Sequence, residues 1–479
     1  MFDLVIRGGT IATAAEVFSA DIGVTGGRIV ALSERLPLGS GGREIDAGGK
    51  IVLPGGIDAH VHIDQAQAPG LASAGAMMAD GFRSGTISAA FGGTTTTISF
   101  AVQHRGTSLR AAVADYHARA TGHAVVDYSF HLVVSDPTPA VLGQELPALI
   151  AAGCRSLKVY MTYDAMRISD RQMLDVMQVA RDQRAVVLVH AENHEAIAWL
   201  AERLEARGDT RPQHHAQSRP LPVEREATHR ALTLAELVGE VPIVIVHVSG
   251  AEPLDEIIRA RARGLRVWAE TCPQYLFLTA GDLDAPDMEG AKVMCSPPPR
   301  DTASQRAIWR GIEDGAFDLI NSDHAPYRFD AQGKLIAGPN PPFRKVSNGI
   351  PGLETRLPLL FSEGVMTGRI PLTRFVAMTA TNNARLYGLA GKGRVSVGAD
   401  ADLVLWNPDR TTTVTNALLH HNVDYTPYEG MVLRGWPETV LSRGEVIVAD
   451  GALHASPGRG RFLEQGLSAA WGAEAGQWT

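Results

Sequence analysis

Six residues of metal-binding or acid–base type stand in, or directly after, short apolar runs of this 479-residue sequence. They are His60, His62, Lys158, His190, His247 and Asp323. His60 and His62 are two residues apart, so on a β-strand both imidazoles leave the same face and are able to share one ion. Imidazoles and carboxylates are common ligands of divalent cations, and a bound cation activates water for hydrolysis. These residues therefore predict a metal site.

A histidine at the end of a strand also has an ordinary structural interpretation, as a polar side chain satisfied by hydrogen bonds. For any one of these residues that alternative stays open. Four histidines and an aspartate stand at the ends of predicted strands, and in a barrel these ends lie together at one mouth. Several ligands from separate segments then meet at one place, which favours a joint metal centre instead.

Lys158 is the unusual member of the set, because an ammonium among histidines and cations would be repelled and poorly solvated. One interpretation is a lysine whose charged end reaches solvent past its apolar stem. The other is an amine that has reacted with carbon dioxide to form a carbamate, which is an anionic ligand able to bridge two ions. The carbamate balances the charge of the site, and we therefore prefer it.

The elements that must position these residues alternate between strand-length apolar runs and helix-length segments. Eight runs are predicted to be strands: KIVLPGGIDAHVH, GTTTTISFA, DYSFHLVVS, SLKVYMT, AVVLVHAE, PIVIVHVS, RVWAET and FDLINSDHA. Helices are predicted at 109–120, 171–183 and 254–264, where apolar residues recur at three- and four-residue steps. This alternation indicates a parallel sheet covered on both faces, and eight units favour a (β/α)8 TIM barrel of the α/β class. An open, doubly wound sheet is the alternative, but no glycine-rich dinucleotide turn follows the first strand.

Both ends of the sequence carry short strands separated by glycine turns, such as FDLVIRGGT near the start and GKGRVSVGADADLVLWNP near the end. We expect them to form one small β-sandwich domain from both chain termini. The predicted boundaries are 1–53 for its first part, 54–385 for the barrel, 386–455 for its second part and 456–479 for a tail that contacts another subunit. The stretch 214–222, HHAQSRPLP, is expected to be an exposed loop.

Charge, apolar runs and cysteines indicate which binding partners and which location to expect. The net charge of -8 argues against nucleic acid and anionic membranes, since both need a basic surface. Apolar runs fall short of the roughly 18 residues of a membrane helix, and MFDLVIRGGT does not resemble a signal peptide. Cys154, Cys272 and Cys295 form neither a CxxC pair nor an even disulfide set, so we expect a reducing cytoplasm.

The segments GGIDAHVH, LKVYMTY, VHAEN, VHVS and NSDHAP occur in an order that resembles the D-hydantoinase/dihydropyrimidinase group of the amidohydrolase superfamily. The resemblance covers nearly the whole chain. It implies two divalent metal ions per chain, usually zinc, and a homotetramer. The implied ligands are His60, His62 and Asp323 for the first ion, His190 and His247 for the second, and N6-carboxylated Lys158 as the bridge.

The activity that the resemblance implies is hydrolysis of the cyclic amide bond of hydantoins or 5,6-dihydropyrimidines to N-carbamoyl amino acids. Asp323 would take a proton from the attacking water and give it to the departing nitrogen. Tyr163 resembles the group's hydrogen-bond donor to the developing oxyanion, with a merely packed rim aromatic as the alternative. Ser296 and Asn348 resemble positions whose backbone groups bind the cyclic imide, with ordinary loop punctuation as the alternative.

Substrate choice is less determined. The residues after His62 lack the arginine that dihydroorotases and allantoinases tend to carry there, although another cyclic ureide or imide hydrolase, allantoinase-like, remains the alternative enzyme. Segment 65–80, with Leu71 and Met78, is expected to be a mouth loop that shapes the pocket for the ring substituent. A non-catalytic scaffold relative is the alternative of another class, and the six retained ligand-type residues argue against it. Cys295 is interpreted as a buried structural thiol.

Overall fold

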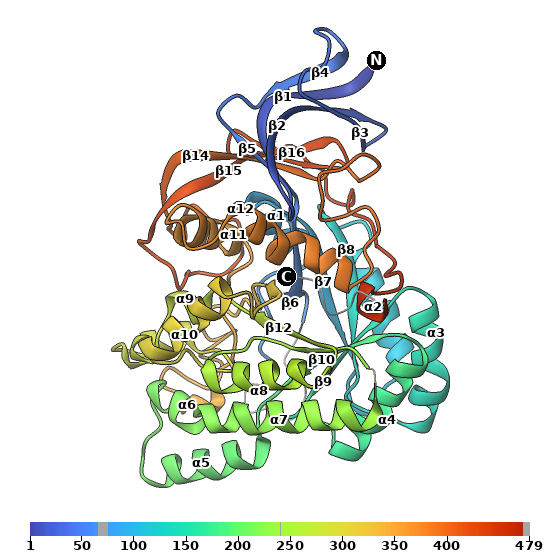
Figure 1. Ribbon diagram of the computed structural model, residues 1–479. Coiled ribbons are helices and arrows are strands. Elements are labelled where there is room, and N and C mark those ends of the chain that lie inside the picture. The colour runs from blue at the N-terminus through green and yellow to red at the C-terminus, as the bar shows by residue number, and fades with distance from the viewer. Residues whose placement is uncertain (66–74, 240, 473–479) are drawn as a thin grey trace.

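The computed structural model describes residues 1–65, 75–239 and 241–472. Eight strands form a parallel sheet in sequential order, and it is the central element of Figure 1. They are β6 (Gly56–Val61), β7 (Thr94–Val102), β8 (Asp127–Val133), β9 (Ser156–Tyr160), β10 (Val186–His190), β11 (Ile243–Ile245), β12 (Val267–Thr271) and β13 (Leu319–Ile320). A parallel bridge between Val61 and His324 brings the first strand beside the end of the last, and the backbone N–H of His62 donates to the carbonyl of His324 at 2.8 Å. The predicted (β/α)8 barrel is confirmed.

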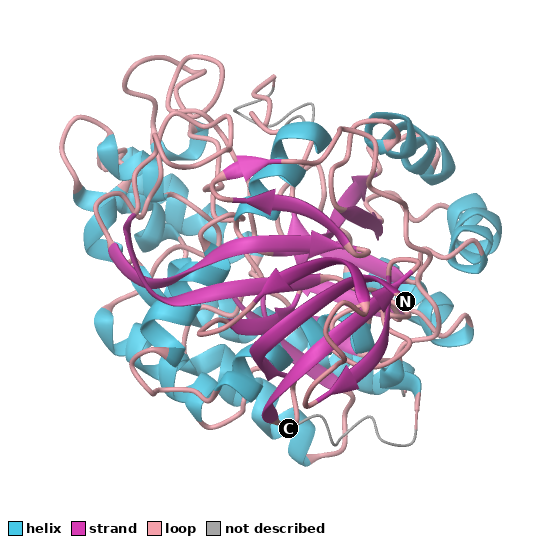
Figure 2. Cartoon of the chain, turned by 90° about the horizontal axis from the view of Figure 1, so that it is seen from above, coloured by secondary structure: helices cyan, strands magenta, loops and turns pink. Residues whose placement is uncertain are grey.

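Helices lie on several sides of the strands, as Figure 2 shows from above. The α-helices are α1 (Phe82–Phe91), α2 (Leu109–Ala120), α3 (Leu146–Ala151), α4 (Asp170–Asp182), α5 (His194–Ala206), α6 (Gln213–Ser218), α7 (Leu221–Val238), α8 (Ala251–Ala262), α9 (Gln274–Phe277), α10 (Thr302–Glu313), α11 (Arg356–Leu360), α12 (Leu372–Val376) and α13 (Asn382–Leu386). The three helices expected from apolar periodicity are α2, α4 and α8. Side-chain caps set the starts of α2 and α4: in α4 the Ser169 hydroxyl accepts from the backbone N–H of Gln172, whose side chain bonds back to the backbone of Ser169.

Strand alternation decides which side chains face the inside of the barrel. In β10, Val186 and Leu188 belong to the interior cluster with Trp268, whereas Val187 and Val189 pack outward against the helices. Because side chains alternate along a strand, His190 follows Leu188 onto the inner face. The inward-facing apolar residues earlier in the strands therefore fill the barrel, and the polar residues lie at its carboxyl-terminal mouth.

The strands from both termini form one nine-stranded mixed sheet at one end of the barrel (Figure 1), as expected for the small domain. Its strands are β1 (Phe2–Ala12), β2 (Val17–Thr25), β3 (Arg28–Ser33), β4 (Gly41–Asp46), β5 (Ile51–Pro54), β14 (Leu403–Thr413), β15 (Val432–Ser442), β16 (Glu445–Ala449) and β17 (Ala452–Leu453). Antiparallel pairing of β5 with β14 joins the two termini.

The run KIVLPGGIDAHVH is two strands rather than the single strand expected from its composition. β5 belongs to the terminal sheet and β6 to the barrel, and Gly55 stands between them. A Cβ at Gly55 would lie 2.1 Å from the hydroxyl oxygen of Thr95, so only glycine fits where the chain crosses from one sheet to the other.

The described part of the C-terminal tail packs on its own barrel. Tyr128 in β8 donates its backbone N–H to the carbonyl of Arg461 and forms a parallel bridge with Phe462. The side chain of Gln465 accepts from the backbone N–H of Arg155 at 2.6 Å. These residues therefore satisfy backbone groups of the same chain, and the contact with another subunit that the sequence predicts for the tail stays a prediction. Residues 473–479 lie outside the described part.

Candidate metal centre

The first group of expected ligands lies together at the mouth of the barrel. One carboxylate oxygen of Asp323 is 3.1 Å from Nε2 of His60 and 3.3 Å from Nε2 of His62. Each of the three residues offers one ligand atom, and these atoms lie within 4.8 Å of one another. Two imidazole nitrogens and a carboxylate oxygen that face a common point form the donor set of a zinc-type site.

The second group is a pair of imidazoles that face each other. Nδ1 of His190 lies 2.9 Å from Nε2 of His247, and the other nitrogen of His247 is buried with no hydrogen-bond partner among the described residues. Burial lowers the pKa of both side chains, so both are neutral at neutral pH. Neutral imidazole is the form that binds a metal.

Lys158 is fully buried, and its charge acts on ligand residues of both groups, on His60 of the first and on His190 and His247 of the second. Its amine has no hydrogen-bond partner within the described part of the chain, and it lies 5.1 Å from the centre of the Tyr160 ring. Burial lowers the pKa of Lys158 to about 8, against the opposing charges of Glu270 and Asp323. An orphaned buried amine close to neutrality is chemically suited to carboxylation, because only the unprotonated amine adds carbon dioxide.

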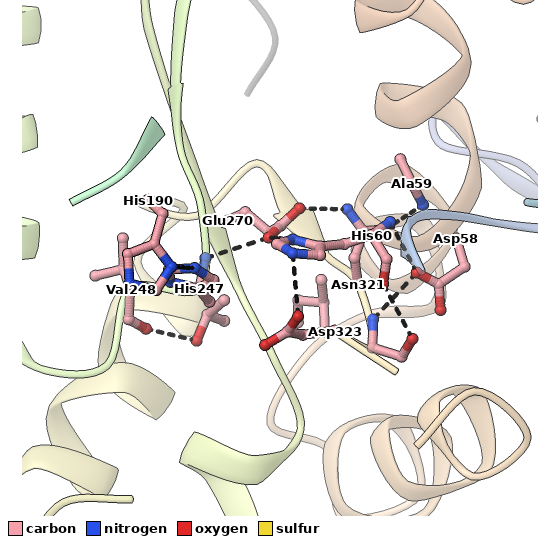
Figure 3. A network of polar contacts seen from close by, with 12 residues as sticks. Asp58, Ala59, His60, His190, His247, Val248, Glu270, Asn321 and Asp323 are labelled. Carbon is pink, nitrogen blue, oxygen red and sulfur yellow. Dashed lines mark hydrogen bonds and ion pairs between the residues drawn. The ribbon is translucent and has the colours of Figure 1, made fainter. Parts of the chain in front are cut away.

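Two buried carboxylates orient the expected ligands, and sequence reasoning did not identify either of them. Glu270 in β12 accepts from Nδ1 of His60 at 2.6 Å, and its other oxygen accepts from the side chain of Asn321 at 2.7 Å (Figure 3). Glu192 lies 2.7 Å from Nε2 of His190. Such hydrogen bonds fix the ring orientation of a metal-binding histidine. The available signal was an acid inside the apolar run RVWAET and another directly after VHA.

Charges within the centre hold it in a defined ionisation state. Burial alone would lower the pKa of His60, but the carboxylates of Glu270 and Asp323 raise it to about 9. Burial would likewise raise the pKa of Asp323, but the imidazoles of His60 and His62 hold it well below its usual range. Asp323 is therefore an ionised hydrogen-bond acceptor at neutral pH.

Strained backbone also gathers at this mouth. His247, Asp323 and Tyr163 have positive φ angles of 44°, 51° and 68° although none is glycine. Non-glycine residues held in this left-handed region cost roughly 1–3 kcal/mol each and concentrate at functional sites, where the fold forces a side chain into position.

A cavity of about 510 Å³ opens above the ligands and contains every expected site residue in its lining. Tyr163 lies there with its ring 5.2 Å from that of His190, and burial raises the pKa of Tyr163 to about 12, so its hydroxyl remains a donor. Ser296 and Asn348 line the same cavity, and the side-chain oxygen of Asn348 is buried without a hydrogen-bond partner in the described chain.

Part of the cavity lining is apolar. It includes Met78, Val102, Tyr160, Met166, Ile197 and Phe343. Met78 comes from the expected mouth loop 65–80, whereas Leu71 lies outside the described residues. Apolar side chains combined with a few polar groups are the usual lining of a pocket that accepts a small organic ring and its substituent.

The expectation of an exposed loop at 214–222 is wrong. The segment contributes helix α6 and places His215, Ser218 and Arg219 at the cavity. Arg219 is 7% exposed, pairs with the carboxylate of Glu192, and holds its guanidinium carbon 5.5 Å from the centre of the Tyr163 ring. The residues of this stretch are mostly polar, and a polar composition fits a buried, hydrogen-bonded segment as well as a solvent-exposed loop.

Cys295 is a buried thiol, as expected. Its sulfur donates to the carbonyl of Pro297 at 3.4 Å, and burial raises its pKa above that of an ordinary thiol, so it stays protonated and unreactive. No helix in the described part of the chain is long and apolar enough to cross a membrane.

The chain thus has the barrel fold, and the mouth of the barrel has the donor set, of a metal-dependent amidohydrolase. Comparison with known proteins supports the same family. A model of the amidohydrolase family matches residues 51–447, so the chain belongs to this family. Its relatives include a D-hydantoinase from Rhizobium radiobacter, 43% identical over 97% of this chain and 99% of that protein. A solved structure of a dihydropyrimidinase from Brevibacillus agri aligns with a TM-score of 0.92, at 39% identity over 97% of this chain and 99% of that one.

An L-hydantoinase from Arthrobacter aurescens aligns with a TM-score of 0.86, at 30% identity over 97% of this chain and 100% of that one. The resemblance to the D-hydantoinase/dihydropyrimidinase group that the sequence motifs indicated is therefore confirmed.

Proposed function

We propose that this protein uses two divalent cations to hydrolyse the cyclic amide bond of hydantoins or 5,6-dihydropyrimidines, which yields N-carbamoyl amino acids. The chain is a cyclic amidohydrolase by family and by its relatives. The observation that carries the two-cation proposal is the fully buried amine of Lys158, which has no hydrogen-bond partner among the described residues and interacts electrostatically with His60 of one set of ligands and His190 of the other.

The residues present fit two cations joined by a carbamate. His60, His62 and Asp323 would hold one ion, and the facing nitrogens of His190 and His247 would hold the other. Carboxylation of Lys158 would turn an unpaired cation into an anionic bridge and remove its buried positive charge. We propose zinc as the metal, because imidazole and carboxylate ligands suit it. Bound cations would supply Lewis acidity, which acidifies water and polarises the amide carbonyl.

The protein's own groups would then move the protons and stabilise charge. Ionised Asp323 lies beside His60 and His62, where it would accept a proton from the water that attacks the carbonyl carbon. The hydroxyl of Tyr163 would donate to the carbonyl oxygen as it becomes anionic. When the ring C–N bond breaks, Asp323 would return its proton to the departing nitrogen, and the carboxylate product would be released.

Ser296 and Asn348 line the cavity and would bind the ring through their backbone groups. The apolar part of the lining would then hold the substituent on the ring, which varies between substrates. We propose preference for the D-enantiomer, because the chain is more similar to relatives named D-hydantoinase than to the L-hydantoinase, at 43% against 30% identity.

Assembly and compartment follow the sequence expectations. We propose a homotetramer, as the resemblance to the D-hydantoinase/dihydropyrimidinase group implies. We also propose a cytoplasmic location, which is supported by the three cysteines Cys154, Cys272 and Cys295, all of them buried and free.

A substrate panel with a metal measurement tests the proposal. Purified, zinc-loaded protein is incubated with dihydrouracil, dihydrothymine, racemic 5-substituted hydantoins and allantoin, and the products are resolved by chiral chromatography. We expect N-carbamoyl products, D-enantiomers from hydantoins, and close to two metal ions per chain. His247→Ala should lose metal and turnover, whereas the control His229→Ala, on an exposed surface of α7, should keep both. Turnover of allantoin alone would favour the allantoinase-like alternative, and full turnover by metal-free protein would refute the mechanism.

A further inference from the structure

Lys334 is a completely buried lysine that the proposed chemistry does not use. Its ammonium donates to the carbonyl of Met294 at 3.2 Å and to the carbonyl of Ser347 at 2.9 Å. These two acceptors belong to different segments of the chain, 53 residues apart by their numbers. One side chain therefore connects two loops.

Both loops continue directly into the cavity. Met294 precedes the lining residues Cys295 and Ser296, and Ser347 precedes the lining residue Asn348. The loops also touch each other, since the backbone N–H of Gly349 donates to the carbonyl of Met294 at 3.0 Å. The ammonium of Lys334 thus lies behind the point at which the two ring-binding segments meet.

Other buried side chains hold the first loop in the same way. Nε2 of His215 donates to the carbonyl of Cys295 at 2.8 Å, and the hydroxyl of Tyr275 donates to the carbonyl of Pro297 at 2.9 Å. Among the backbone–backbone hydrogen bonds of the described residues, none reaches the carbonyl of Ser296 between them. The peptide of Ser296 is therefore fixed on both sides by buried side chains and not by a backbone donor to its own carbonyl.

Burial of a lysine at this position is unfavourable in free energy. Transfer of an ammonium out of water without a carboxylate is unfavourable, and burial lowers the pKa of Lys334 to about 7. The other buried lysine with such contacts, Lys392, bonds at 2.7 Å to the carboxylates of both Asp127 and Asp402. An amine offers two or three N–H donors from one atom, which is what two carbonyls of separate loops require. A methionine of similar length would fill the space, but the carbonyl of Ser347 would lose this donor and the carbonyl of Met294 would keep only the N–H of Gly349.

We propose that Lys334 is a positioning residue for substrate binding, which ties the Ser296 and Asn348 loops together so that their peptide groups match a cyclic imide. This inference rests on the proposed function. It assigns to Lys334 a role in ring recognition that is independent of the ring substituent, because the bonded loops face the part of the substrate that all members of the class share.

The test is Lys334→Met in the full-length, zinc-loaded enzyme, with KM and kcat measured for dihydrouracil, 5-methylhydantoin and 5-phenylhydantoin. Loss of one or two backbone hydrogen bonds predicts a KM about tenfold higher for all three substrates, with kcat and metal content unchanged within about twofold. Lys292→Met is the matched control, since Lys292 stands two residues before Met294, pairs with Glu289 and is not among the residues that line the cavity. It should keep the parental KM.

Several results would overturn the inference. These are a parental KM in Lys334→Met, a KM change confined to one substituent, and a lower melting temperature with KM unchanged, which is the signature of a purely structural lysine. If Lys334→Met does not fold, Lys334→Gln replaces it, because its amide retains two donors and should give a smaller rise in KM. A parent enzyme that hydrolyses none of the three substrates would refute the proposed function instead, so the two failures are distinguishable.

Discussion

The amine of Lys158 lies 5.3 Å from the centre of the Phe100 ring and has no hydrogen-bond partner among the described residues. An aromatic face attracts a cation weakly and does not replace a carboxylate as a partner for a fully buried charge. Lys158 therefore stands in surroundings that suit a modified side chain held by metal ions better than a free ammonium.

If Lys158 carries a carbamate, Lys158→Ala should remove the bridge, lower metal occupancy and abolish turnover. Acetate or propionate should then restore part of the activity, because a short-chain carboxylate supplies two oxygen ligands in the vacated space. The restored rate should saturate with the concentration of the acid. Ethylamine at the same concentrations is the control, and it should not restore turnover alone.

The reverse pattern, with rescue by ethylamine and none by acetate, would indicate that Lys158 acts as an ammonium. A density map of the metal-loaded enzyme with an unmodified amine at this position would contradict the carbamate directly.

The second prediction concerns the hydroxyl of Tyr163. Tyr163→Phe keeps the ring against His190 but removes the donor to the developing oxyanion, so kcat should fall by about 100-fold or more while metal content stays constant. Tyr428→Phe is the control, because the hydroxyl of Tyr428 is also buried but has no hydrogen-bond partner among the described residues and does not line the cavity. Equal rates for Tyr163→Phe and the parent would leave this tyrosine as a packed rim residue.

The third prediction concerns the apolar part of the cavity lining. Met78 is 8% exposed and lines the cavity, whereas the adjacent Met77 is 49% exposed and does not. Met78→Ala should change the ratio of kcat/KM between 5-phenylhydantoin and 5-methylhydantoin by about tenfold, since it removes apolar contact with the substituent alone. Met77→Ala should leave the ratio unchanged. Metal analysis of both variants should give the parental value, and an unaltered ratio in Met78→Ala would mean that the substituent binds elsewhere.

The fourth prediction is a pH dependence of stability. Burial lowers the pKa of Lys334 from 10.5 to about 7, so across this window the unfolded chain binds more protons than the folded protein. The free energy of unfolding therefore gains a contribution that rises with pH from about 7 towards 10.5, and at lower pH the cost of burying the charge is fully present.

Lys334→Met lacks this titration. The difference in free energy of unfolding between parent and variant should therefore increase with pH, as measured by urea denaturation at several values between about pH 6 and pH 9.5. Lys292→Met again serves as the control and should show no such trend. A difference that is constant with pH would mean that Lys334 keeps its ordinary pKa in the folded protein.

The sequence alone was sufficient to predict the barrel and to place the six ligand-type residues at the ends of its strands. Buried parallel strands are nearly continuous apolar runs, so His190 after VVLV and Asp323 after the run FDLINS are visible as chemistry at strand ends. The fold then brings those ends to one mouth whatever the side chains between them. The rule that one apolar run is one strand uses local composition only. In KIVLPGGIDAHVH it therefore missed the crossing at Gly55 from one sheet to the other.

Only the tertiary structure decided which other groups hold these residues in place. Glu270 is 210 residues from His60, and Lys334 is 40 residues from Met294, yet each pair is joined by a hydrogen bond. Neither contact leaves a periodic trace, because a buried polar side chain is specified by a partner that is distant in the chain and not by its neighbours. The polar stretch 214–222 is the same case, since its letters are those of a solvent-exposed loop and its burial depends on the cavity that the remaining chain builds around it.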